Sequence, residues 1–371
     1  MHAGCKKWRR LIVILHLIQK DKFTHGFIAF INDHFDPSEH RFFVYGEDSV
    51  SGYRESSDSN VRNFPGSQAM LLDRDARASF GQAELIVANG CFNWPMLFSL
   101  YRHRSRLCLL FWGGDIYSLS TKSTPVKNIV KRLALSFVEN CGYVSTLFMS
   151  DYRELSSFAC LKGSYYPLTL LPDQSQVPDY RSLRDIEKCT HPIRILLGNS
   201  ATPTNRHKSV IEQLAAYKQE DMMVYAPLSY GDPSYRDEVI AYGSRLLKEK
   251  FIPIVDFMPY TEYLDFLNSC SVGVFNHHRQ QGMGNLYCLG QLGAKVYLAS
   301  DSIMLEELAH DGIAVYDTDS IGDISYSEFL ALSNDVRQSN INAIEKKRSL
   351  ERAISLWSAL FEEARRRTEA C

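Results

Sequence analysis

Short apolar runs rich in branched residues alternate with amphipathic helical patterns along most of the chain. Such runs are typical of strands buried on both faces of a parallel sheet, and the patterns between them are typical of crossover helices. In the first half, the predicted strands span residues 11–18, 41–45, 85–88, 107–112 and 143–148. In the second half, they span residues 193–197, 222–225, 252–255, 272–275, 296–298 and 313–316. The alternation predicts an α/β fold with parallel sheets.

A change of composition divides the chain. Residues 163–188 contain Pro167, Pro172 and Pro178 among Ser, Asp and Gln residues, which is typical of an interdomain connection. We therefore predict one domain over residues 1–175 and a second over residues 190–340. Residues 341–371 carry apolar side chains at helical spacing with charged residues between them, which predicts a long C-terminal amphipathic helix that packs back on the body.

The composition agrees with two domains. The 371 residues are 45% hydrophobic, which is enough for two cores. The formal net charge of −2 argues against a nucleic-acid ligand, but it combines two unequal parts. Residues 1–175 contain 20 basic and 16 acidic side chains, whereas residues 176–371 contain 21 basic and 27 acidic ones.

Two features concern the compartment. The nine cysteines form no C-x-x-C pair, which is typical of free thiols in a reducing cytosol. No apolar run approaches the roughly 18 residues that a membrane-spanning helix needs. We therefore expect a protein that is soluble, or that lies on a membrane surface without crossing it.

The most informative loop follows the predicted strand 272–275 and opens an apolar helix. Gly282 and Gly284 allow the backbone to approach a ligand closely, and Arg279 can neutralise phosphate charge through two parallel hydrogen bonds. Backbone N–H groups at such a helix start suit a diphosphate. The alternative is a tight turn in which the glycines serve only the conformation of the chain.

A second polar loop follows the first predicted strand of the second domain. Gly198 permits a sharp turn, and Asn199 and Ser200 can donate hydrogen bonds to phosphate oxygens. Asn205 and His207 lie near the following helix start. Because helix capping alone would explain Ser200 or Asn205, both interpretations stay open.

In the predicted first domain, the strand 107–112 ends in two glycines followed by Asp115. A carboxylate at the carboxyl end of a strand can act as a general base. The alternative is an Asx turn or a helix cap, which is the more common role of an isolated Asp. Similar polar groups occur at residues 89–95 and around His16, Asp21 and His25.

The sequence contains no convincing metal or cofactor site. Residues 73–75 and 317–319 match an Asp-x-Asp pattern, but three-residue matches are frequent by chance. His277 and His278 are adjacent, and neighbouring side chains rarely point to one metal centre. We therefore predict no metal and no cofactor.

The basic excess of the first half is concentrated in residues 94–132. Seven basic side chains stand there against one acidic side chain, Asp115, with apolar residues interleaved. Basic amphipathic helices of this kind bind anionic lipid surfaces. An ordinary solvated helix face is the alternative.

Three of these segments together resemble glycosyltransferase family 56, the TDP-N-acetylfucosamine:lipid II N-acetylfucosaminyltransferase family. The segments are residues 112–117 (Trp-Gly-Gly-Asp-Ile-Tyr), 197–200 (Leu-Gly-Asn-Ser) and 279–284 (Arg-Gln-Gln-Gly-Met-Gly). The resemblance extends from His16 to about Leu298 and is firmest over residues 193–298. Further matching residues are Asn93, Asn205, His207, Tyr230, Tyr263 and Leu264. Residues 49–78, 201–204 and the tail beyond Asp301 do not share it, which leaves the sugar and the acceptor open.

The resemblance implies an α/β fold of the GT-B type, in which two Rossmann-like domains face a cleft. The first domain would bind the acceptor and the second a nucleotide-sugar. The implied enzyme moves a deoxyamino hexose such as N-acetylfucosamine from a TDP-sugar or other nucleoside-diphosphate sugar to a polyprenyl-diphosphate-linked saccharide. It would invert the anomeric centre without a metal, as a peripheral protein at the cytoplasmic face of the bacterial inner membrane, in enterobacterial common antigen or O-antigen synthesis.

The resemblance also implies roles for single residues. Asp115 would deprotonate the acceptor hydroxyl, and His16 is a second candidate base. Residues that would bind the acceptor are Asn93, Trp112 and Tyr117. Residues that would hold the donor nucleotide and diphosphate are Gly198, Asn199, Ser200, Asn205, His207, Tyr230, Arg279, Gln280, Gln281, Gly282, Gly284 and Asn285.

Two other functions remain compatible with the sequence. One is a nucleotide-sugar epimerase or hydrolase on the same two-domain scaffold. The other is a non-catalytic protein that binds a nucleotide-sugar or a glycan.

Overall fold

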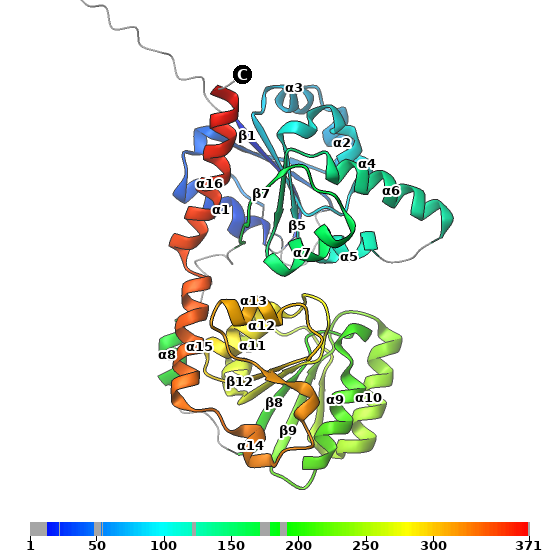
Figure 1. Ribbon diagram of the computed structural model, residues 1–371, viewed down its shortest axis with the longest axis vertical. Helices are drawn as coiled ribbons and strands as arrows, with labels where there is room; N and C mark the ends of the chain where they lie inside the picture. Colours follow the sequence, from blue (N-terminus) through cyan, green and yellow to red (C-terminus); the bar gives the residue numbers. More distant parts are fainter. Residues whose placement is uncertain are drawn as a thin grey trace, which may run out of the picture. The chain divides into compact units, whose positions relative to one another are not determined.

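The computed structural model describes residues 13–21, 23–47, 53, 55–120, 124–170, 179–185 and 191–369 (Figure 1). The first residues of the predicted strand 11–18, and Pro172 and Pro178 of the predicted connection, lie outside the described residues. The chain divides into two compact units. One unit comprises Met1–Val177 together with Leu350–Cys371, and the other comprises Pro178–Ser349.

The N-terminal unit is built on a parallel sheet with the strand order β3-β2-β1-β4-β5-β6-β7. The strands are β1 (Ile14–Gln19), β2 (His40–Tyr45), β3 (Val61–Phe64), β4 (Leu85–Asn89), β5 (Leu107–Phe111), β6 (Tyr143–Thr146) and β7 (Ser164–Tyr165). Every residue of β4 and β5 is buried, because helices cover both faces of the sheet. This burial explains why their sequences are continuous apolar runs.

Two cores cover the two faces of this sheet. On β1, Leu15 and Leu17 enter one core, whereas Ile14 and Ile18 enter the other. The first core includes side chains of α2 (Ser67–Leu72), α3 (Arg74–Gln82), α4 (Trp94–Ser99), α5 (Gly114–Ser120), α6 (Pro125–Glu139) and α7 (Met149–Phe158). The second core includes side chains of α1 (Thr24–His34) and α16 (Leu350–Glu369).

The C-terminal unit repeats the same topology with the strand order β10-β9-β8-β11-β12-β13. The strands are β8 (Ile193–Leu197), β9 (Met222–Pro227), β10 (Phe251–Ile254), β11 (Val272–Phe275), β12 (Lys295–Leu298) and β13 (Tyr316–Asp317). The helices are α8 (Tyr180–Asp185), α9 (His207–Leu214), α10 (Pro233–Leu247), α11 (Tyr260–Ser269), α12 (Met283–Gln291), α13 (Leu305–His310), α14 (Tyr326–Leu330) and α15 (Asn334–Lys347). This strand order is that of the Rossmann fold.

The predicted strands correspond to strands of the structure, but two strands were not predicted. Val61–Phe64 is partly exposed, and Ser164–Tyr165 is only two residues long. Edge strands of this kind carry little apolar patterning because one side of each lacks a neighbouring strand. The predicted strand 313–316 overlaps the observed β13 only at Tyr316.

The predicted C-terminal amphipathic helix is present as α16 and packs in the second core, but its predicted range of residues 341–371 began too early. The structure contains two helices, α15 and α16, separated at Arg348 and Ser349. Helix α15 belongs to the C-terminal unit and α16 to the N-terminal unit. Apolar spacing continues across the break because each helix buries a stripe of its own, so the sequence pattern does not mark the boundary.

Candidate functional site

The order of the C-terminal sheet reverses between β8 and β11, which pair directly. Chain connections leave these two strands in opposite directions, and ligands of open α/β sheets bind outside the carboxyl ends of strands at such a point. The loops that follow β8 and β11 are residues 198–206 and 276–282. They are the two second-domain loops that the sequence analysis selected.

Side-chain hydrogen bonds join these two loops. The Gln281 amide donates from Nε2 to Asn199 Oδ1 at 3.0 Å. Gln281 Oε1 accepts from Thr204 Oγ1 at 2.7 Å and from Arg279 Nε at 3.1 Å. Asn199 Nδ2 donates to the Tyr230 hydroxyl at 3.1 Å. The network brings together four of the predicted donor-binding residues, and Tyr230 is 62% exposed beside them.

Two glycines make this arrangement possible. Gly198 has φ +69°, and a Cβ there would lie 2.6 Å from His207 Nε2. Gly282 has φ +65°, and a Cβ there would lie 3.2 Å from the Asn199 side chain. At both positions a side chain would meet backbone strain and a close contact, so the loops need glycine.

Helix α12 begins directly after Gly282, and no side chain caps its first turn. The first N–H groups of a helix have no partner within the helix, and together they attract anions. Gly284, in this first turn, is exposed, and a Cβ placed on it would meet no heavy atom within 4 Å. Space is therefore available over the start of α12.

Three other predicted donor-binding residues are buried under the first loop. Ser200 Oγ lies 2.8 Å from Thr202 Oγ1, and Asn205 Nδ2 donates to the Ser200 carbonyl at 2.8 Å. The His207 backbone N–H donates to the Tyr235 hydroxyl at 3.2 Å, and burial lowers the pKa of His207 to about 4. These side chains hold the conformation of the loop that carries Asn199.

The remaining polar residues of the second loop have distinct positions. Gln280 is half-buried, and the half-buried Asn285 donates from Nδ2 to the Tyr263 hydroxyl at 2.8 Å. His277 is fully buried, and its burial lowers its pKa to about 4, so it is neutral. His278 Nδ1 lies 2.5 Å from the Asp301 carbonyl oxygen.

In the N-terminal sheet the order reverses between β1 and β4. Asp115, in the first turn of α5, lies beside the loop that follows β4. Its carboxylate accepts from the backbone N–H groups of Cys91 at 2.9 Å, Trp112 at 3.0 Å and Ile116 at 3.1 Å. The side chain is fully buried, and desolvation raises its pKa to about 6. Asp115 thus connects the loops after β4 and β5, and its side chain does not reach the surface.

The second candidate base, His16, is also fully buried. Its Nε2 lies 3.0 Å from His40 Nδ1, and its ring stacks on Phe42 at a centroid distance of 4.8 Å. Burial lowers the pKa of His16 well below its usual value. His16 faces the core beneath α1 and α16, because side chains alternate along β1 and His16 points to the same face as Ile14 and Ile18.

The predicted acceptor residues Asn93 and Trp112 lie in the loops after β4 and β5, and Tyr117 lies in the helix that follows the second loop. Trp112 Nε1 donates to Asn89 Oδ1 at 2.8 Å, which fixes the indole ring. Asn93 caps α4 by accepting from the Met96 N–H at 3.1 Å, and it donates to Ser67 Oγ at 2.9 Å. Tyr117 is half-buried on α5.

Two aromatic residues of this edge were missed by the sequence analysis. The Phe23 ring meets Trp112 edge-on at a centroid distance of 5.6 Å and is 40% exposed. Phe92 is 54% exposed and packs over the Cβ positions of Gly90 and Gly114. Their place just after β1 and β4 is a signal that could have found them, since strand ends beside the reversal point collect ligand contacts.

Asp-x-Asp pairs of the sequence have structural roles. Asp73 caps α3 and pairs with Arg62, and Asp317 accepts from the Asp319 N–H. Among the described residues, no group of three or more His, Cys, Asp or Glu side chains is arranged to hold a metal ion.

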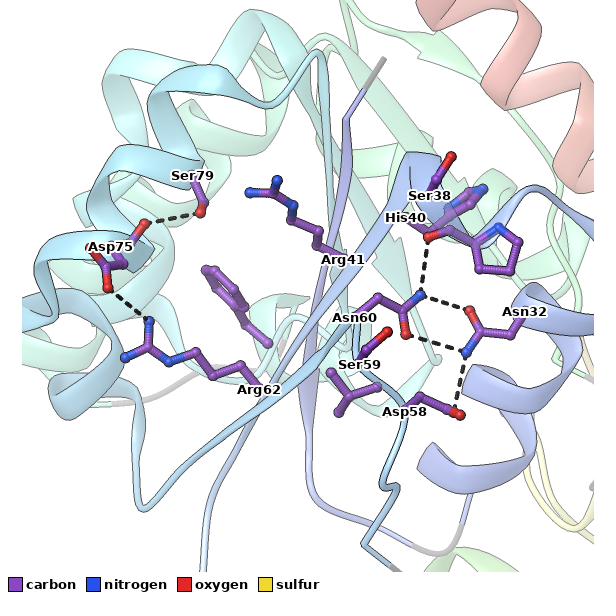
Figure 2. A pocket seen from close by; sticks show the side chains of 13 residues that line it. Asn32, Ser38, His40, Arg41, Asp58, Ser59, Asn60, Arg62, Asp75 and Ser79 are labelled. Atoms are coloured by element: carbon purple, nitrogen blue, oxygen red, sulfur yellow. Dashed lines mark hydrogen bonds and ion pairs between the residues drawn. The ribbon is translucent and has the colours of Figure 1, made fainter. Parts of the chain in front are cut away.

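An open cavity of about 640 Å³ lies elsewhere in the N-terminal unit. Figure 2 shows it between α3 and the end of α1, at the amino-terminal ends of β2 and β3. It is therefore at the sheet edge opposite to the carboxyl-end loops described above. Its lining includes Arg41, Arg62, Asp58 and Asp75.

A family model for the 4-alpha-L-fucosyltransferases of glycosyl transferase group 56 matches residues 11–329. The chain belongs to glycosyltransferase family 56. The match includes both sheets and all of the loops described above. The protein is therefore a sugar transferase that uses a nucleotide-sugar donor and an acceptor, which favours this function over the epimerase and non-catalytic alternatives.

Solved structures of other proteins share the fold of this family-56 enzyme. A glycosyltransferase from Rickettsia africae matches with a TM-score of 0.65 and 10% identity, over 95% of this chain and 98% of that one. A trehalose 6-phosphate synthase from Burkholderia multivorans matches with a TM-score of 0.61 and 10% identity, over 97% and 99%. A sucrose-phosphate synthase from Thermosynechococcus elongatus matches with a TM-score of 0.62 and 11% identity, over 95% and 98%. The predicted α/β fold of the GT-B type is confirmed.

Proposed function

We propose that this family-56 enzyme transfers a deoxyamino hexose, such as N-acetylfucosamine, from a nucleoside-diphosphate sugar to a polyprenyl-diphosphate-linked saccharide. The observation that carries the proposal is the uncapped start of α12. It directly follows Gln281, whose hydrogen bond to Asn199 joins the two loops. The name of the matched family, a 4-alpha-L-fucosyltransferase group, supports a 6-deoxyhexose as the sugar. The acceptor and the place in common-antigen or O-antigen synthesis rest on the sequence resemblance.

On the donor side, the diphosphate would accept hydrogen bonds from the free N–H groups of the first turn of α12. Arg279, whose Nε is directed by Gln281, would contribute positive charge. As the bond to the sugar breaks, negative charge grows on the leaving diphosphate, and prearranged donors stabilise that charge without reorganisation. The exposed ring of Tyr230 would pack against the base or the sugar.

On the acceptor side, the loops after β1, β4 and β5 of the N-terminal unit offer the rings of Phe23, Phe92 and Trp112. Pyranose rings present apolar C–H faces that suit such aromatic surfaces. Asp115 would act by holding the loops after β4 and β5 together, since its carboxylate accepts hydrogen bonds from a backbone N–H group of each loop. We propose a single displacement with inversion, in which the acceptor oxygen bonds to the anomeric carbon as the bond from that carbon to the diphosphate oxygen breaks, and the proton of the acceptor hydroxyl passes to water.

The proposal places the enzyme at the cytoplasmic face of the bacterial inner membrane as a peripheral protein, because the acceptor carries a polyprenyl chain. No described helix is long and apolar enough to cross a membrane. The basic excess of the first half supports an approach to an anionic lipid surface.

The substitution Gly284→Ala tests the donor site. The added methyl group meets no protein atom within 4 Å, so the fold tolerates it, and Ala is favoured over Gly in a helix by up to about 1 kcal/mol. A diphosphate bound over the first turn of α12 would meet that methyl group. We expect the donor KM to rise at least about tenfold while the melting temperature is unchanged or higher.

Gly81→Ala is the matched control, because Gly81 lies in α3 and its Cβ position is also open. It should leave the donor KM unchanged. Steady-state kinetics with a panel of nucleotide-sugars and a lipid-linked acceptor, followed by mass spectrometry of the product, give both the sugar and the KM. An unaltered donor KM in Gly284→Ala would contradict the placement of the diphosphate.

A further inference from the structure

Helix α6 carries one apolar stripe that is buried at its C-terminal end and exposed at its N-terminal end. Ile129, Leu133 and Phe137 follow one another at a spacing of four residues and so lie on one helix face. At the C-terminal end of the stripe, Phe137 is buried in the core of the N-terminal unit. At the N-terminal end, Ile129 is 60% exposed and Leu133 is 57% exposed, and the neighbouring Val130 is 42% exposed.

The exposed part of this stripe lies toward the carboxyl ends of the strands. Helix α6 leads into β6 at its C-terminal end, and crossover helices run antiparallel to the strands they connect. Its N-terminal half therefore lies on the side of the loops after β4 and β5, which carry Phe92 and Trp112. Figure 1 shows α6 projecting from the rest of the N-terminal unit.

Basic side chains accompany the exposed apolar residues. Lys127 and Arg132 are exposed on α6 itself. At the other, C-terminal end of α6, Tyr101 meets the buried Phe137 at a ring distance of 6.1 Å and carries the Arg104 guanidinium 4.5 Å over its ring, so these two residues do not belong to the exposed stripe. Among the described residues from 94 to 138, the one acidic side chain is Asp115, which is buried.

We propose that the N-terminal half of α6 docks on an anionic lipid surface, with Ile129, Val130 and Leu133 inserted among the acyl chains. Lys127 and Arg132 would lie at the level of the anionic headgroups, where each basic side chain adds to the attraction. The absence of exposed acidic side chains in this part of the described structure favours an anionic membrane over a protein surface of mixed charge. The inference rests on the proposed lipid-linked acceptor, which places this face of the enzyme at the membrane.

Flotation of the purified full-length enzyme with vesicles tests the inference. Vesicles of phosphatidylglycerol and phosphatidylcholine are compared with vesicles of phosphatidylcholine alone. The apolar variant combines Ile129→Ser with Leu133→Ser, and the basic variant combines Lys127→Ser with Arg132→Ser. All four side chains are exposed, so the fold should tolerate both variants. Leu72→Ser, at an 81% exposed leucine of α2, and Lys218→Ser with Lys346→Ser are the matched controls.

We expect the wild type and the controls to float with the anionic vesicles and much less with the neutral ones. The apolar variant should bind at least about tenfold more weakly. The basic variant should lose about fivefold for each cation, with a smaller dependence on salt. Equal flotation of the apolar variant and the wild type would overturn the inference. So would self-association in sedimentation velocity that depends on Ile129 and Leu133, because that result would assign the stripe to a second copy of the chain.

Sugar transfer in detergent to a short-chain acceptor separates this inference from the proposed function. Docking is not needed in that assay, so both variants should retain transfer. If the wild type floats but transfers no sugar, the proposed function fails and the docking surface stands. If it transfers sugar but the apolar variant floats normally, the docking surface fails and the proposed function stands.

Discussion

At the scale of single residues, Asp115 stands just after the end of a strand, where a catalytic carboxylate is expected, but its carboxylate accepts hydrogen bonds from backbone N–H groups. Its oxygens accept from three backbone N–H groups, two in the loops after β4 and β5 and one in α5, and the side chain has no exposed surface. A base must reach the hydroxyl from which it removes a proton. The loops that Asp115 connects carry Phe92 and Trp112, so its effect on an acceptor would be indirect.

Asp115→Asn tests this positioning role. The carboxamide NH₂ would face backbone N–H groups, and each buried donor left without an acceptor costs about 1–3 kcal/mol. We expect a lower melting temperature and a higher acceptor KM, with the shape of the pH profile of kcat unchanged.

Asp73→Asn is the control. Asp73 also accepts a hydrogen bond from a backbone N–H group of this unit, but it lies between α2 and α3, away from the loops after β4 and β5. The variant should leave the acceptor KM unchanged. Loss of kcat by a factor of about 10² or more, with an unchanged melting temperature and loss of one limb of the pH profile, would instead restore Asp115 as the base.

At the scale of elements, α16 covers a buried histidine pair. The rings of His16 and His40 lie beneath Trp357 and Phe361 of this helix. Burial, together with the positive charge of Arg365, lowers the pKa of His40 to about 4. Arg365 also forms an ion pair with Glu39, so α16 is attached to the sheet by both apolar and charged contacts.

This burial predicts an acid-sensitive N-terminal unit. The unfolded chain binds a proton at His40 below about pH 6.5, whereas the folded chain does so only below about pH 4. Stability is therefore complete above about pH 6.5 and falls as the pH drops toward 4, by about 3 kcal/mol for His40 alone. Asp115, whose pKa is raised, has the opposite effect, so the difference between variant and wild type is the quantity to measure.

Urea unfolding of the wild type and of His40→Phe at pH 7, 5.5 and 4.5 checks this prediction. The variant should show a smaller loss of unfolding free energy as the pH falls. His310→Phe, at a side chain that is 89% exposed, should behave like the wild type. Parallel pH dependence of His40→Phe and the wild type would show that His40 does not titrate differently in the two states.

At the scale of the whole molecule, each unit has its own core. The N-terminal cores include Trp357 of α16, although this residue lies far along the chain, and the C-terminal core includes Phe329. Trp357 is fully buried, and its Nε1 donates to the Thr169 carbonyl at 2.9 Å. The N-terminal unit is therefore completed by the last helix of the chain.

Separate cores predict separate effects of core substitutions. Trp357→Ala should destabilise the N-terminal unit by about 3–5 kcal/mol, because a large cavity remains where the indole was. Phe329→Ala, also at a fully buried ring, should have a similar effect on the C-terminal unit. Hydrogen exchange measured by mass spectrometry should show faster exchange in β1, β2 and α16 for the first variant, and in β8, β9 and α14 for the second. Equal acceleration in both units for either variant would contradict the separation.

The amino-acid sequence by itself determined the central strands of both sheets and the loops that carry polar residues at their ends, but not the edge strands β3 and β7. Strands such as 193–197 and 272–275 were predicted with their observed bounds, because a strand buried on both faces must be a continuous apolar run. Glycines after these strands marked the turns for a similar local reason, since positive φ excludes most side chains.

Only the tertiary structure decided which of the polar residues lie in exposed loops and which are buried among hydrogen-bond partners. Asp115 follows an apolar strand and His16 lies within one, yet both are fully buried, and each has a partner distant in sequence, Cys91 for Asp115 and His40 for His16. The contact of Gln281 with Asn199, 82 positions away, and the assignment of α15 and α16 to different units are of the same kind. Local pattern reflects the burial of an element, whereas the partner of a side chain depends on which elements pack together in space.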